Sequence, residues 1–339
     1  MSAAAGAPAA AARPAAVRPG VESAGVESAR AESAGVESAE ARSRRRFVAD
    51  VMGVHDRMSL RGLADAVEPE HLLHLSRHAD GLVVLAARHQ GIPQRYLLGI
   101  HGFRLAQYLR LRFADEGLAY RRALFAEPYR SEGSNEVHVL AMDERSGSIL
   151  RYISLVGAPG SDPADLRDPA RTLFPCERAH GVNLFDHVPM DDEVSTGEVW
   201  EVKRLVHRGP LGGDDGVTRL RVTLEMMLGF YTALGRIRPQ VKVLVGDGEE
   251  GVAIQRTLRS LKEITVLEGT TPSLPADDLM FPLYTQRDVV KAFAALAPRG
   301  AELDHLTARL RDALAHEDLL VGFKSMVGQV GGRLRRVAV

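Results

Sequence analysis

A strand, a long amphipathic helix and a second short apolar strand follow one another between residues 197 and 245. Residues 197–206 (GEVWEVKRLV) are rich in the β-branched and aromatic residues typical of a strand. The helix is expected over Val217–Leu234, whose large apolar side chains recur on one side, and residues 241–245 (VKVLV) read as a buried strand. Strands joined through a helix run parallel, so this order predicts an α/β fold with a parallel pair after the Trp200 strand.

The Trp200 strand carries two charged side chains, Glu201 and Arg204, at a spacing of three. Strand alternation places these two side chains on opposite faces unless a bulge intervenes. A carboxylate and a guanidinium inside such a strand have two interpretations. They are either a structural ion pair or a catalytic pair in which Glu201 deprotonates an amine and Arg204 binds a carboxylate.

Other strands are expected on both sides of this unit. Residues 136–142 and 148–156 alternate around the turn 143–147 and predict an antiparallel hairpin. Residues 263–267 and 280–284 predict two later strands, and 118–129 and 251–261 predict helices.

The N-terminal part of the chain has a different composition. Residues 1–45 are dominated by Ala, Gly, Pro, Ser and Glu, and the Gly-Val-Glu-Ser-Ala unit recurs, so we expect a disordered tail. From 46 to 116 the apolar residues recur at helical spacing, which predicts an all-helical region. The domain of the Trp200 strand is then expected over 117–300, with a helical segment over 301–339.

The predicted helix over residues 71–89 would place His71, His74 and His78 on one face. That spacing suits metal ligands, but no cysteine or second paired motif completes a tetrahedral set. The simpler interpretation is a solvated polar face, and no metal site is expected.

Composition excludes several classes of protein. The chain has 339 residues and a net charge of −1, which gives no overall attraction to nucleic acid or to a membrane surface. No apolar run approaches the roughly 20 residues of a membrane-spanning helix. Cys176 is the single cysteine, so no internal disulfide can form, and a reducing cytoplasm is expected. We interpret this lone cysteine as a small buried apolar residue rather than a nucleophile.

Four features resemble one enzyme family, and one of them is the helix that ends near Leu234 followed by the strand 241–245. Residues 121–125 (RRALF) look like an Arg-x-x-x-Phe motif on a first helix, 139–143 (VLAMD) with Gly147 look like a first hairpin, and 200–205 (WEVKRL) look like a Trp-Glu-x-Ser-Arg-Phe strand. Together they resemble the GNAT acyltransferase superfamily, and within it the acyl-homoserine lactone (autoinducer) synthases and long-chain N-acyl amino acid synthases. The likeness covers about residues 117–285 and implies a mixed, twisted sheet flanked by helices.

The resemblance also implies an activity and a set of site residues. It implies transfer of a fatty acyl group from a thioester to the amine of a small molecule such as an amino acid or its derivative, with no tightly bound cofactor. A non-catalytic acyl- or metabolite-binding module, or a protein-interaction module, on the same fold is the alternative. Glu201 and Arg204 are the expected catalytic residues, and the expected substrate-binding residues are Arg121, Phe125, Asp143, Arg151 and Trp200.

The expected donor is an acyl carrier protein or coenzyme A. Enzymes of this superfamily that use acyl-CoA usually hold its pyrophosphate on a glycine-rich loop and the following helix N-terminus. Here residues 208–215 (RGPLGGDD) have glycines one place away from that pattern, and Asp214 and Asp215 would repel phosphate. This departure favours an acyl carrier protein over coenzyme A.

Overall fold

A computed structural model describes residues 38–128, 135–158, 162–188, 194–209, 216–249, 263–285, 290–330 and 333–339. The chain divides into two compact units, Met1–Arg42 and Ser43–Val339. The helices are α1 (Ala39–Arg57), α2 (Leu63–Ala66), α3 (Gln94–Arg110), α4 (Glu116–Arg121), α5 (Pro175–His180), α6 (Gly216–Arg236), α7 (Phe281–Thr285), α8 (Ala301–Ala315) and α9 (Leu319–Val330). No helix among the described residues is both long enough and apolar enough to cross a bilayer.

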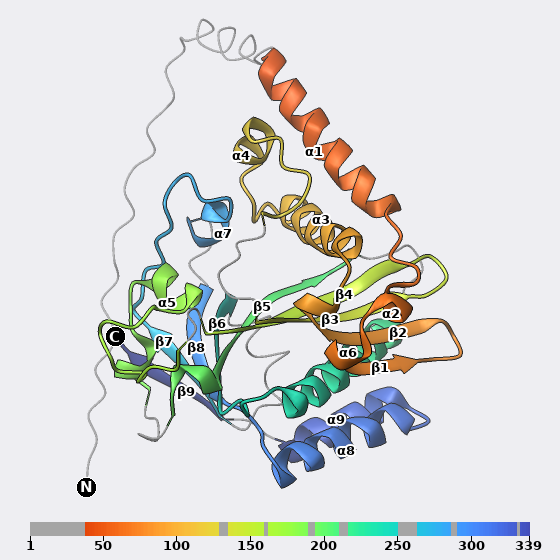
Figure 1. The fold of residues 1–339 in the computed structure, drawn as a ribbon, viewed down its shortest axis with the longest axis vertical. Coiled ribbons are helices and arrows are strands. Elements are labelled where there is room, and N and C mark those ends of the chain that lie inside the picture. The colour runs from red at the N-terminus through yellow and green to blue at the C-terminus, as the bar shows by residue number, and fades with distance from the viewer. Residues whose placement is uncertain are drawn as a thin grey trace, which may run out of the picture. The chain divides into compact units, whose positions relative to one another are not determined.

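One nine-stranded sheet organises the second unit (Figure 1). Its strands lie in the order β1-β2-β3-β4-β5-β6-β8-β7-β9. Neighbours are antiparallel except for the pairs β5–β6 and β7–β9, which are parallel. The strands are β1 (Leu72–Arg77), β2 (Leu82–Arg88), β3 (Glu136–Asp143), β4 (Ser148–Gly157), β5 (Val199–His207), β6 (Val243–Glu249), β7 (Glu263–Glu268), β8 (Val290–Leu296) and β9 (Arg333–Ala338).

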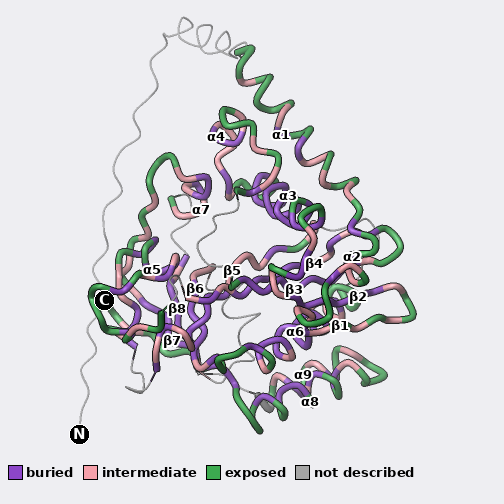
Figure 2. Tube along the Cα trace, in the orientation of Figure 1, coloured by how far each residue is buried: buried purple, intermediate pink, exposed green. Residues whose placement is uncertain are grey.

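Helices cover both faces of this sheet. The buried side of α6 packs with α8 and α9 against one face, in a core that includes Trp200 and Leu244. On the other face α3 packs in a second core that includes Leu140 and Tyr152. Figure 2 shows α6 and α3 buried along much of their length, whereas much of α8 and α9 is exposed. A third core lies around α5 and includes Phe174 and Val245.

The predicted α/β class, the hairpin and the parallel pair after the Trp200 strand are confirmed. The predicted hairpin corresponds to β3 and β4, and α6 and β7 lie where a helix and a strand were expected. Strands β5 and β6 are the parallel pair. The predicted helix over 251–261, the loop 210–215 and residues 1–37 of the predicted tail lie outside the described residues.

The prediction of an all-helical region over 46–116 is wrong. Residues 72–77 and 82–88 form the antiparallel hairpin β1–β2. The side chains of β2 are buried on both faces of the sheet, so its sequence is continuously apolar and does not alternate. A short apolar stretch of this kind does not distinguish a strand from a helix. The turn between the strands has Gly81 at φ 93°, the left-handed conformation that a tight turn uses. His71 and His74 therefore belong to a turn and a strand, and they share no helix face with His78.

Four other boundaries differ from the predictions. Residues 281–285 form α7 instead of a strand, and the neighbouring strand is β8. The C-terminal segment, predicted helical over 301–339, ends in β9. Helix α1 begins at Ala39, inside the predicted tail, because the arginine- and alanine-rich residues after it favour a helix. Helix α4 ends at Arg121, and Ala123 at φ 48° is incompatible with a continued helix.

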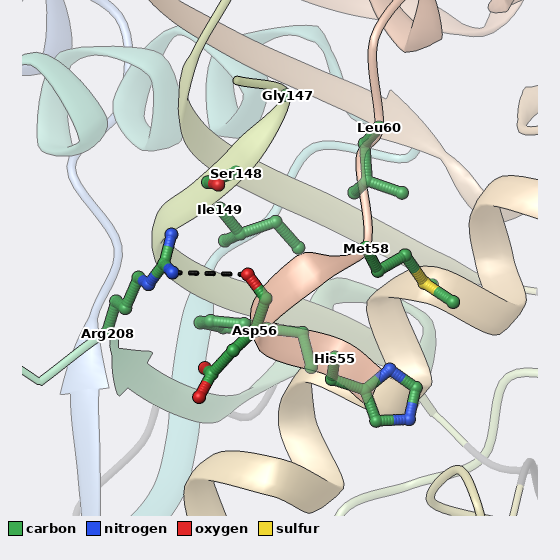
Figure 3. Close-up of a pocket in the computed structure, with 10 residues that line it drawn as sticks. His55, Asp56, Met58, Leu60, Gly147, Ser148, Ile149 and Arg208 are labelled. Carbon is green, nitrogen blue, oxygen red and sulfur yellow. Dashed lines mark hydrogen bonds between the residues drawn. The ribbon is translucent and has the colours of Figure 1, made fainter. Parts of the chain in front are cut away.

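The turn between β3 and β4 packs against the segment that leaves α1 (Figure 3). Gly147 in this turn has φ 72°, and its carbonyl accepts a 2.8 Å hydrogen bond from the Leu60 amide. A Cβ at Gly147 would lie 2.6 Å from the Arg61 nitrogen and 2.8 Å from the Leu60 nitrogen. Nearby, the Arg208 guanidinium donates to the Asp56 carbonyl at 3.3 Å.

We therefore expect Gly147→Ala to destabilise the fold more than Gly81→Ala. Both glycines occupy hairpin turns at positive φ, where an alanine costs about 1–2 kcal/mol. At Gly81 the nearest atom to an added Cβ is the Arg145 Nε at 3.5 Å, so only the conformational cost applies. Urea unfolding of the two variants measures the difference, and equal losses would show that the Gly147 contact adds nothing.

Candidate functional site

Strand β5 contains the bulge that decides where its charged side chains lie. Ser154 of β4 pairs with Lys203, but Tyr152 pairs with Val206, so two residues of β5 face one residue of β4. Arg204 adopts φ 61° at this point, a conformation rare for a residue with a side chain. The bulge shifts the alternation, and Glu201 and Arg204 consequently line the same cavity.

The same stretch of β5 separates from its parallel neighbour. Strands β5 and β6 pair only from Val199↔Val243 to Glu201↔Val245, although β5 continues to His207 and β6 to Glu249. Beyond Glu201 the backbone pairing between β5 and β6 therefore stops, although both strands continue. A cavity of about 380 Å³ lies beside this point.

The cavity has walls from several elements. Its lining residues come from α3, the segment after α4, strands β3–β6, α5, the segment that leads into α7, and α7 itself: His101, Arg104, Arg122, Leu124, Glu127, Pro128, Glu136, Ser154, Val156, Pro175, Cys176, Arg178, Ala179, Glu201, Lys203, Arg204, Asp247, Leu274, Asp278, Leu279, Met280 and Tyr284. The lining includes both charged groups and apolar side chains, so the cavity can hold a molecule with a polar end and an apolar end.

Glu201 is a buried carboxylate that retains bonding capacity. It is 1% exposed, and its Oε2 atom has no hydrogen-bond partner among the described residues. Its Oε1 lies 3.6 Å from the Lys203 Nζ. Burial raises the pKa of Glu201 to about 7; Lys203 opposes this shift and the nearby Asp247 adds to it. Near neutral pH this carboxylate can therefore both accept and release a proton.

Arg204 belongs to a buried network of ion pairs instead of pairing with Glu201. Its guanidinium lies 2.5 Å from Oε1 of Glu127, and Arg104 donates to Oε2 of the same carboxylate at 2.7 Å. Burial alone would raise the pKa of Glu127, but Arg104 and Arg204 lower it to about 2. Arg104 also reaches Glu136 at 3.4 Å and the Tyr152 hydroxyl at 3.3 Å.

A further carboxylate of the cavity is Asp247 of β6. The Tyr284 hydroxyl donates to its Oδ2 at 2.5 Å, and the His180 Nε2 lies 3.7 Å from the same oxygen. Because Tyr284 lies on α7, this bond ties α7 to the sheet beside Glu201.

A cluster of three histidines, His89, His101 and His138, adjoins the cavity, and His101 belongs to α3. His138 of β3 is fully buried; its Nδ1 lies 2.7 Å from the Tyr152 hydroxyl and its Nε2 lies 3.0 Å from the His89 Nδ1. Burial lowers the pKa of His138 to about 3 and that of His101 to about 4, and it lowers the pKa of His89. All three imidazoles are therefore neutral at pH 7.

The described residues contain two groups whose side chains are close enough to share a metal ion. His89, Glu136 and His138 form a largely buried group, and Glu68, Glu70 and His71 form an exposed one. Neither group is the expected set of His71, His74 and His78.

The sequence-predicted site residues separate into two sets. Glu201 and Arg204 meet at the cavity, whereas the five predicted substrate-binding residues do not line it. Trp200 packs in the core that the sheet forms with α6. The Asp143 carboxylate accepts hydrogen bonds from the backbone nitrogen of Arg145 and the hydroxyl of Ser146 in the hairpin turn. Phe125 is 53% exposed and contacts Phe47. Arg121 lies at the exposed end of α4, next to the cavity residue Arg122, and Arg151 is partly buried on β4.

Sequence reasoning missed Arg104, Glu127, Glu136 and Asp247. Two of these carry a signal in the sequence. Arg104 is a charged residue inside an otherwise apolar stretch of helix, and Glu136 alternates with His138 on a strand that is buried on both faces. Glu127 lies in an irregular segment, and only the fold shows that it meets Arg104.

No protein-family model matches the sequence, and no curated protein has a significantly similar sequence. Among solved structures, the CoA-dependent acyl-homoserine lactone synthase BjaI is similar in two forms, one with MTA and one with SAM and isopentyl-CoA. Each aligns at 17% identity and a TM-score of 0.33, over 64% of this chain and 85% of the other.

Proposed function

We propose that this protein is an N-acyltransferase that moves a fatty acyl group from a thioester to the amine of a small molecule. The observation that carries the proposal is Glu201, a fully buried carboxylate with pKa about 7 and an unbonded oxygen, in the cavity where β5 and β6 separate. Such a group suits general-base catalysis near neutral pH.

In the proposed reaction the amine nitrogen attacks the thioester carbonyl carbon. Glu201 accepts the proton that the nitrogen loses as the C–N bond forms. The C–S bond then breaks, the acyl group stays on nitrogen as an amide, and the thiolate leaves and takes up a proton. The oxyanion of the tetrahedral intermediate needs hydrogen-bond donors, and the backbone of β5 beyond Glu201, where the ladder to β6 ends, is the nearest source of them.

The charges of the cavity support an acceptor with both an amine and a carboxylate. Arg204 and Arg104 pair with Glu127 and Glu136, and the same cavity is lined by Glu201 and Asp247. An amino acid or amino-acid derivative could place its carboxylate near the guanidinium of Arg204 and its amine near Glu201.

Mass spectrometry tests the proposed activity directly. The purified chain is incubated with acyl thioesters of several lengths and a panel of amino acids, and lipid extracts of expressing cells are analysed in parallel. We expect an N-acyl product together with stoichiometric release of free thiol. Tight binding of an acyl thioester without release of thiol would favour the alternative, a non-catalytic acyl-binding module.

We further propose an acyl carrier protein as the donor and expect its use to depend on salt. The cations Arg121, Arg122 and Arg178 lie on or beside the cavity wall, and a carrier protein is acidic enough to be attracted to them. Raising the salt concentration should therefore lower kcat/KM for the acyl carrier protein. Equal kcat/KM values for acyl-CoA and the acyl carrier protein, insensitive to salt, would contradict this choice of donor and leave acyl transfer intact.

A further inference from the structure

The cluster of His89, Glu136 and His138 brings two imidazoles and a carboxylate together from strand β3 and the turn that follows β2. Glu136 and His138 are two residues apart on β3 and so lie on the same face of the sheet. His89 begins the 3₁₀ turn His89–Gly91 directly after β2, the strand that pairs with β3. One ligand atom from each of the three side chains lies within 4.8 Å of the other two.

The two histidines contact each other through one nitrogen each, in a hydrogen bond that a shared metal ion would replace. The His138 Nδ1 is engaged by the Tyr152 hydroxyl at 2.7 Å, which leaves Nε2 to face the His89 Nδ1 at 3.0 Å. Two ligands at 2.0–2.1 Å from a tetrahedral zinc ion lie about 3.3 Å apart, so only a small outward movement would admit the ion. A hydrogen bond from the second ring nitrogen to an oxygen is the usual outer contact of a ligating histidine.

Among the described residues, the carboxylate of the cluster has only long hydrogen bonds, from Arg104 and from the Tyr152 hydroxyl, each of 3.4 Å to Oε1. Arg104 lies 2.7 Å from Glu127 but 3.4 Å from Glu136, so its closer partner is Glu127. The Glu127 carboxylate, paired with Arg104 and Arg204, reduces the positive charge that opposes a metal ion here, and Glu136 supplies a second negative charge.

We propose that His89, Glu136 and His138 bind a divalent transition metal ion of the zinc class. Imidazole nitrogen with a carboxylate oxygen is a ligand set that zinc accepts, and three protein ligands leave a fourth position open. Glu136 and His101 both line the cavity, and the His101 ring lies 6.3–6.4 Å from the rings of His138 and His89. The site therefore adjoins the cavity through Glu136.

Metal titration of the full-length, untagged chain tests this site. The protein is stripped with a chelator, dialysed and titrated calorimetrically with Zn²⁺, and then with Co²⁺ to observe the visible bands of a tetrahedral site. We expect one equivalent to bind. We expect His89→Ala and Glu136→Gln to weaken binding by more than 100-fold. Tyr152→Phe removes the outer contact of His138 together with the longer bonds of this hydroxyl to Arg104 and Glu136, and we expect it to weaken binding by about 10–100-fold.

His71→Ala is the matched control because His71 belongs to the exposed group with Glu68 and Glu70. We expect this variant to bind like the unmodified chain. Binding that survives both His89→Ala and Glu136→Gln, or that His71→Ala abolishes, would overturn the proposal, as would less than one equivalent bound by a correctly folded chain. His89 is only partly buried, so its variant keeps the test valid even where a substitution at His138 prevents folding.

Discussion

Glu201→Gln is expected to preserve the fold and to lower the rate of acyl transfer by about 10²–10⁴-fold, the usual cost of losing a general base. Glutamine has nearly the same shape, so the packing around β5 stays intact, but it cannot accept the amine proton. Steady-state kinetics with a saturating donor measure the loss. A rate within a few-fold of the unmodified chain would remove Glu201 from the mechanism.

The pH dependence adds a second readout for the same variant. The base is the ionised carboxylate, so activity of the unmodified chain should rise with pH through about 7, and this rise should disappear in Glu201→Gln.

Because burial raises the pKa of Glu201 above its usual 4.5, the folded state holds a proton that the unfolded chain releases between pH 4.5 and 7. The contribution of Glu201 to stability therefore falls as the pH rises through this window, and the variant should become the more stable of the two above pH 7.

Glu198→Gln is the matched control for these measurements. Glu198 directly precedes β5, but its carboxylate pairs with Lys242 at 2.7 Å and does not line the cavity. We expect this variant to retain the rate and the pH profile of the unmodified chain. An equal loss in both variants would show that the effect comes from the electrostatics of the strand and not from proton transfer.

The sequence was sufficient for the order of elements around β5, because alternation and helical periodicity are local properties. It was not sufficient for residues 72–88, where the enclosed strand β2 has no alternation to read. It also missed β8 and β9, of which β9 forms an exposed edge rich in arginine and carries little apolar signal.

The candidate site was predictable only in part, for a physical reason. Glu201 and Arg204 are visible as charges inside an apolar strand, but their shared orientation depends on a bulge that the register with β4 creates. The partners of Arg204 come from distant segments: Glu127 follows α4, and Arg104 lies within α3. Contacts of this kind depend on how the segments pack, and the residue pattern of one segment does not encode them.

Arg104→Met is expected to destabilise the fold by about 3–5 kcal/mol, the range for removing one partner of a buried ion pair. Arg104 is 5% exposed and is the cation shared by Glu127, Glu136 and the Tyr152 hydroxyl. Methionine fills a similar volume, so the loss comes mainly from two buried carboxylates left with too little positive charge. For a chain of this size the melting temperature should fall by on the order of 10 °C.

Arg110→Met provides the comparison on the same helix. Arg110 pairs with Asp56 at 2.8 Å, but both side chains are about a third or more exposed, and such a pair contributes at most about 1 kcal/mol to stability.

The stability of the two variants should also depend differently on pH in the acid range. Glu127, held at a pKa of about 2, stabilises the unmodified chain above pH 4.5 and loses this effect as the pH falls towards 2. The deficit of Arg104→Met should therefore be largest at neutral pH and shrink in acid, whereas a deficit independent of pH would mean that packing, and not charge, is what Arg104 supplies.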